Sequence, residues 1–75
     1  MPHIIVKMKQ GRTEEQKSGL TNQIVKAVTK SLGVGPEAVS IELIDVNPDE
    51  WKSSVFESDI VPKLGGLAKE PGTLQ

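Results

Sequence analysis

Pro2 is the residue of this chain whose type and position could do the most unusual chemistry. Methionine is removed most readily when a small residue follows it, so cleavage after Met1 would leave a chain that begins with the secondary amine of proline. An α-amino group titrates near ~7.7 to 8.0, and an apolar pocket or a nearby cation lowers that value. Such an amine could accept and return a proton near neutral pH. With Met1 attached, the nitrogen is an amide without useful basicity, and Pro2 would merely start an edge strand without a donor.

The length and composition of the chain restrict what could support such a site. The 75 residues make one small domain, residues 1–75, which buries only about 60% of the surface that the unfolded chain exposes. The sequence has no cysteine and a single histidine, His3, so disulfides are excluded and no familiar zinc cluster can form. Oligomerisation is the remaining common stabiliser. We expect neither a metal nor an organic cofactor.

The charge pattern argues against two classes of partner. A net charge of −1 without a long basic run gives no indication of nucleic-acid binding. No apolar stretch approaches the roughly 20 residues that span a bilayer, and the N-terminus lacks the basic and apolar regions of a signal peptide. We therefore expect a cytoplasmic protein that binds neither nucleic acid nor membranes.

The elements that would position Pro2 can be predicted from hydrophobic periodicity. Alternation over residues 3–9 predicts a half-buried strand with Ile4, Val6 and Met8 on one face. Thr13 and Gln16 form the pattern of a capping box, so a helix should start there and end near Gly33. The three–four spacing predicts the inner face of this helix, whereas Lys17, Asn22, Lys26 and Lys30 should mostly occupy the outer one. The predicted inner face contains Leu20, Ile24, Ala27, Val28, Ser31 and Leu32.

A second strand is expected over residues 39–46, where Ile44 breaks the alternation and indicates either a bulge or a strand end buried from both sides. Strand, helix and strand in this order make a crossover with parallel strands, so residues 1–46 form a β-α-β core of the α/β (α+β) class. Residues 47–69 should form a cover of short helices broken by Pro62 and Gly65-Gly66. Residues 70–75 should be a loose tail.

Two strands and one helix do not make a stable unit, because both sheet edges stay open. A second copy could pair the sheets edge to edge into four strands with two helices on one face. We therefore expect a homo-oligomer, and the polar outer sheet face with the long C-terminal cover favours a dimer over a hexamer.

The chain resembles a known family. Met1-Pro2, the segment Gly11-Arg12-Thr13-Glu14-Glu15-Gln16-Lys17, the amphipathic helix and the second strand resemble the 4-oxalocrotonate tautomerase family, and residues 47–72 look most like its bacterial PptA-type subgroup. In that family an N-terminal proline moves a proton between the oxygen and the carbon of an enol acid. The resemblance implies that Pro2 is the general base and that Arg12 binds the substrate carboxylate through its planar fork.

Strand geometry adds a constraint to these roles. Each strand residue advances about 3.3 Å, so Pro2 and Arg12 should lie roughly 20 to 25 Å apart at opposite ends of a strand. Both could act on one small molecule only if Arg12 came from a neighbouring subunit, as in an antiparallel dimer. The alternative for Arg12 is a solvated loop residue beside the helix start.

The resemblance also bears on Trp51 and Ser40. Trp51 stands where the family places an aromatic wall of the pocket, although it could equally anchor the C-terminal cover. Ser40 replaces the second arginine of family members that act on a diacid, which favours a monoacid such as an enolpyruvate and removes one electrostatic clamp. His3 should be a surface residue rather than an acid catalyst. Lys7 and Lys9 should be solvated.

These observations predict a tautomerase for a small enol or 2-oxo acid. Two alternatives stay open. Related N-terminal-proline enzymes hydrate or dehalogenate unsaturated acids with additional arginines and a glutamate, which have no evident counterparts here. A non-enzymatic dimeric binding module with a vestigial pocket would also account for the missing arginine.

Overall fold

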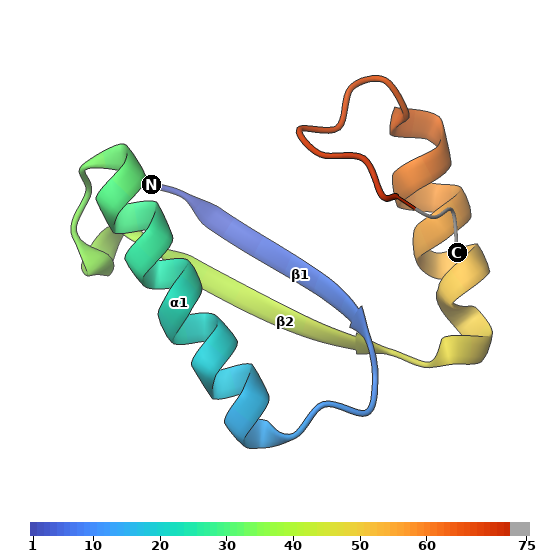
Figure 1. Cartoon of the computed structure of the whole chain (residues 1–75), viewed down its shortest axis with the longest axis horizontal. Helices are drawn as coiled ribbons and strands as arrows, with labels where there is room; N and C mark the ends of the chain where they lie inside the picture. Colours follow the sequence, from blue (N-terminus) through green and yellow to red (C-terminus); the bar gives the residue numbers. More distant parts are fainter. Residues whose placement is uncertain (73–75) are drawn as a thin grey trace.

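The computed structural model describes residues 1–72, so residues 70–72 of the predicted tail are included and residues 73–75 lie outside the described part. The order of elements confirms the β-α-β core (Figure 1). The core contains β1 (His3–Lys9), α1 (Glu14–Leu32), the short 3₁₀ turn η1 (Pro36–Ala38) and β2 (Ser40–Val46). Three consecutive helical pieces follow, namely η2 (Pro48–Glu50), η3 (Lys52–Ile60) and η4 (Val61–Lys63), which we call the C-terminal segment.

The two strands pair in parallel, as the crossover predicts, in a continuous register from His3 opposite Ser40 to Lys9 opposite Val46. The N-terminus therefore lies at one end of the sheet, and the loop between β1 and α1 lies at the other (Figure 1). Helix α1 packs along one face, where Ile4, Val6 and Met8 are half-buried.

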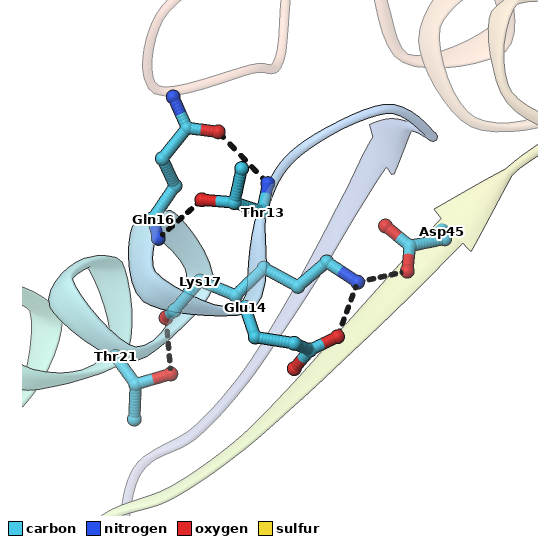
Figure 2. Close-up of polar contacts among 6 residues, drawn as sticks. All are labelled: Thr13, Glu14, Gln16, Lys17, Thr21 and Asp45. Carbon is cyan, nitrogen blue, oxygen red and sulfur yellow. Dashed lines mark hydrogen bonds and ion pairs between the residues drawn. The ribbon is translucent and has the colours of Figure 1, made fainter.

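Helix α1 begins and ends where its capping residues predict. The Thr13 hydroxyl accepts a hydrogen bond from the Gln16 N–H at 3.0 Å, and the Gln16 side chain accepts one from the Thr13 N–H at 2.9 Å (Figure 2). Gly33 adopts a left-handed conformation with φ of 70° and donates its N–H to the Thr29 carbonyl at 3.0 Å. These contacts satisfy backbone groups that a helix terminus otherwise leaves unpaired.

The predicted inner face of α1 was partly wrong. Leu20 and Leu32 are 37% and 63% exposed, and Ala27 and Ser31 are exposed as well. The half-buried stripe at the helix centre instead consists of Thr21, Ile24, Val25, Val28 and Thr29. The hydroxyls of Thr21 and Thr29 donate to backbone carbonyls one turn earlier, at 3.1 Å and 2.9 Å, so these polar side chains can face the sheet at low cost.

Lys17 also lies on the inner side of α1, although the pattern placed it with the solvated lysines. Its side chain is only 18% exposed, and its ammonium bonds to the Asp45 carboxylate near the end of β2, with Glu14 Oε1 3.5 Å away (Figure 2). The hydrogen bond to Asp45 raises the pKa of Lys17 above its ordinary value. The first turn of α1 is thereby tied to the end of β2.

The irregularity at Ile44 reflects burial from both sides of the sheet rather than a bulge. The strand register is unbroken through Ile44, and the following Val46 is buried, with 9% of its surface exposed. Val55 of the C-terminal segment, 5% exposed, is the other buried residue of the described chain. The remainder of the sheet face opposite α1 stays open, with Ile5 52% exposed.

The C-terminal segment consists of short helical pieces, as expected, and the change from η3 to η4 falls at Val61, directly before Pro62. Pro62 lies in the first turn of η4, where a missing N–H costs little, so helical turns continue to residue 63. Gly65, with φ of 90°, follows the end of the helical turns. Rather than lying flat over the sheet, the segment leads away from the end of β2 (Figure 1). Asp59 ties it to β1 through an ion pair with Lys7 at 2.5 Å.

This ion pair predicts a pH dependence of stability. The hydrogen bond from Lys7 holds the pKa of Asp59 below its usual 3.8, so the folded state favours the ionised carboxylate. The resulting stabilisation is present above about pH 4 and is lost as the pH falls through the lowered pKa. Asp59→Asn should therefore lower the urea midpoint slightly near pH 6 and reduce the further loss on acidification. Urea denaturation at one fixed protein concentration measures both effects.

Glu57→Gln is the matched control, because Glu57 is an exposed acid of the same helical piece without an ion pair in residues 1–72. It should keep the wild-type acid dependence. If the Asp59→Asn and wild-type midpoints fell in parallel with pH, the ion pair would not anchor the C-terminal segment.

Candidate active site

The structure places the predicted site residues in two groups at opposite ends of the sheet. Pro2 and Ser40 lie where the strands begin, whereas Arg12 and Trp51 lie just beyond the strand ends. Seven strand steps of about 3.3 Å separate Pro2 from Lys9, a span of about 23 Å. A single chain therefore does not bring Pro2 and Arg12 onto one small molecule.

At the first end, Pro2 is half-buried and Met1 is 99% exposed. The Ser40 N–H donates to the Pro2 carbonyl at 3.2 Å, which extends the ladder by one residue. The Ser40 hydroxyl lies 2.7 Å from His3 Nδ1 and holds the exposed imidazole against the start of β2. Ser40 thus takes part in fixing the segment that carries Pro2, and His3 lies at the surface, where the alternation places it.

At the second end, a tight turn presents Arg12. Gly11 has a φ of 118°, a backbone conformation that side-chain-bearing residues rarely adopt, and the Gln10 N–H donates to the Val46 carbonyl at 2.9 Å. Arg12 Nη1 in turn donates to the Lys9 carbonyl at 3.1 Å, which holds the exposed guanidinium at the end of β1. Within residues 1–72 no carboxylate oxygen lies within 4 Å of Arg12.

Trp51 joins the second group from the C-terminal segment. Its ring is half-buried, and the Lys9 ammonium lies 5.6 Å from the ring centroid. The indole Nε1 is buried and makes no hydrogen bond within residues 1–72. The prediction that Lys9 and Lys7 are simply solvated was therefore incomplete: both are exposed, but Lys9 packs over Trp51 and Lys7 pairs with Asp59. These contacts join residues about forty to fifty positions apart, so periodicity could not reveal them.

Two grooves lie between the open sheet face and the C-terminal segment. One, of about 380 Å³, is lined by Ile5, Lys7, Val55, Asp59 and Lys63. The other, of about 360 Å³, has Lys7 and Val55 in common with it and reaches Asp45, Asn47 and Glu50. Pro2, Arg12, Ser40 and Trp51 line neither of these grooves. The predicted site residues therefore lie at the two ends of the sheet and outside these two grooves.

No helix within residues 1–72 combines the length and the apolar character that crossing a bilayer requires.

Comparison with known proteins shows the family. A family model described as "Tautomerase enzyme" matches residues 1–53. The chain is 36% identical over 73 residues to Tautomerase PptA of Cronobacter sakazakii, an alignment that covers 96% of each protein. It is also 36% identical over 72 residues to a probable tautomerase of Xylella fastidiosa, covering 96% of this chain and 88% of that protein.

Solved structures agree with these relatives. YwhB, a homologue of 4-oxalocrotonate tautomerase, superposes with a TM-score of 0.62 at 33% identity, over 64% of this chain and 79% of YwhB. A 4-oxalocrotonate tautomerase isozyme from Methylibium petroleiphilum superposes with a TM-score of 0.65 at 30% identity, over 67% and 81% of the two chains. The fold, the relatives and the family match show that this chain belongs to the tautomerase family of isomerases.

Proposed function

We propose that this enzyme transfers a proton between the oxygen and the carbon of a small enol or 2-oxo acid, with Pro2 as general acid and base and Arg12 as the carboxylate-binding residue. The observation that carries this proposal is the position of Arg12: its guanidinium is held at the end of β1 without a carboxylate partner in residues 1–72. A planar fork with unused donors suits a substrate carboxylate.

The site would be shared between two copies of the chain. An antiparallel arrangement of two β1 strands would place the Pro2 end of one copy next to the Arg12 end of the other. Each copy would then contribute a half to each of two equivalent sites. Two copies are needed because a span of about 23 Å separates the two ends of the strand within one chain.

Packing supports such an assembly. In residues 1–72 only Val46 and Val55 are buried, and the described sheet has two strands, so each strand has an unpaired edge. Ile5 and Leu32 are more than half exposed. A second copy would cover an edge and part of this apolar surface, so we propose a homodimer with a four-stranded sheet and two helices on one face, in preference to a hexamer.

The reaction needs no oxidant and no second substrate. Removal of Met1, whose 99% exposure leaves it accessible to an aminopeptidase, would free the Pro2 nitrogen. This amine takes the proton of the enol hydroxyl as the C=O bond forms. The protonated amine then gives a proton to the carbon, which accepts it with the electron pair of the former C=C bond. Arg12 holds the carboxylate throughout, and the Trp51 ring supplies an apolar wall that keeps water away from the amine.

Ser40 narrows the substrate class. It is neutral and exposed at the Pro2 end, and its hydroxyl is engaged with His3. It therefore offers no second cation for a second carboxylate at that end. A monoacid with an apolar substituent, such as phenylenolpyruvate, fits this end better than a diacid.

Loss of the proline amine should abolish most of the activity. Pro2→Ala, which still permits removal of Met1, leaves a primary amine and should lower kcat/KM for the ketonisation of phenylenolpyruvate by about 100-fold or more. Protein that retains Met1 should be inactive, and mass spectrometry identifies each form. Pro71→Ala makes the same change at an exposed position and should keep the wild-type rate. A native enzyme that is active with Met1 attached would contradict the role of Pro2.

Loss of the guanidinium should act mainly on substrate binding. Arg12→Ala should raise KM and lower kcat/KM by about 10- to 100-fold, because a charge-assisted bidentate contact is lost. The kcat/KM of Arg12→Lys should lie between those of the wild-type and Arg12→Ala proteins, because lysine keeps the charge but not the planar fork. Steady-state kinetics measure both variants, with Lys26→Ala on the outer side of α1 as the control. Equal rates for wild-type, Pro2→Ala and Arg12→Ala would favour a binding module without this activity.

A further inference from the structure

A second cation lies beside Arg12 at the end of β1. We propose that Lys9 binds the 2-oxygen of the enol or 2-oxo acid whose carboxylate Arg12 binds, so that the two cations form one clamp. This inference rests on the proposed function and adds a second substrate contact to it.

The position of Lys9 is fixed through both its backbone and its side chain. Its carbonyl accepts the hydrogen bond from Arg12 Nη1 at 3.1 Å, which couples the two residues directly. Its ammonium lies 5.6 Å from the Trp51 ring centroid, so the long stem is held along the ring that we propose as the pocket wall. Arg12, Lys9 and Trp51 therefore form one contiguous cluster from three segments of the chain.

The charges around this cluster favour an anion. Neighbouring lysines of the same region have carboxylate partners, since Lys7 pairs with Asp59 and Lys17 pairs with Asp45. Within residues 1–72 no carboxylate oxygen lies within 4 Å of either Lys9 or Arg12. Two cations at the same end of β1 that lack a carboxylate partner favour the binding of an anion there.

The two side chains match the two oxygen groups of an enol acid. The guanidinium presents a planar fork for the carboxylate, whereas an ammonium is a compact charge with three donors, which suits a single oxygen. When the enol proton leaves for the Pro2 amine of the other copy, the 2-oxygen gains negative charge. A fixed ammonium at this oxygen stabilises that charge, so Lys9 would supply the electrostatic contact that Ser40 does not provide at the other end.

Binding of two small acids separates the roles of the two cations. Butyrate has a carboxylate alone, and 2-oxobutyrate adds the 2-oxygen on the same chain length. Lys9→Met keeps an unbranched stem that can pack on Trp51 but has no charge. This variant should weaken the binding of 2-oxobutyrate by about tenfold, which is the effect expected for the loss of one charged contact, and should leave butyrate binding unchanged. Arg12→Ala should weaken the binding of both acids.

NMR titrations of the Met1-free assembled protein give the dissociation constants, and the fluorescence of the single tryptophan checks that its surroundings are preserved. Lys9→Arg should restore most of the preference for 2-oxobutyrate, and Lys26→Met, which removes an exposed helix cation, should behave as wild-type.

An unchanged ratio of the two affinities in Lys9→Met would overturn the inference, and so would an equal loss for both acids, because Lys9 would then bind the carboxylate. Unchanged butyrate binding in Arg12→Ala would instead contradict the proposed function itself.

Discussion

Backbone hydrogen bonds at both ends of the β1–β2 ladder hold the two strands in one parallel register. At one end the Ser40 N–H donates to the Pro2 carbonyl, and at the other the Gln10 N–H donates to the Val46 carbonyl. The crossover helix requires the strands to be parallel, and the strand length then keeps the N-terminal amine about 23 Å from the turn that carries Arg12. The proposed reaction therefore becomes a property of an assembly, because the fold itself separates its two halves.

The two ends of the sheet differ in how they are built. Four segments meet at the far end: the Lys17–Asp45 pair ties α1 to β2, the Lys7–Asp59 pair ties the C-terminal segment to β1, and Lys9 packs over Trp51. At the Pro2 end, the Ser40 N–H donates to the Pro2 carbonyl and the Ser40 hydroxyl lies 2.7 Å from His3 Nδ1, and no ion pair of the described residues joins the segments there. The proposed carboxylate-binding residue and the proposed base thus lie at differently built ends, which two copies arranged head to tail would bring together.

The sequence predicts the core elements well because their signals are local. Alternation over residues 3–9, the capping box at Thr13 and the left-handed Gly33 each depend on neighbouring residues, and the structure confirms all three. The inward position of Lys17 was missed because it depends on Asp45, which is distant in sequence. The same holds for the contact of Lys9 with Trp51, which no local pattern encodes. The separation of Pro2 from Arg12 was predictable, since it follows from strand geometry alone.

Subunit mixing tests most directly whether each active site takes Pro2 from one copy and Arg12 from another. Equal amounts of the Pro2→Ala and Arg12→Ala proteins are dissociated, mixed and reassembled, with an affinity tag on one variant to confirm hybrid formation. Random pairing makes half of the dimers hybrids, and each hybrid has one intact site of two, so we predict recovery of about a quarter of the wild-type activity. Confirmed hybrids without recovered activity would contradict the shared site, because Pro2 and Arg12 would then have to act within one chain.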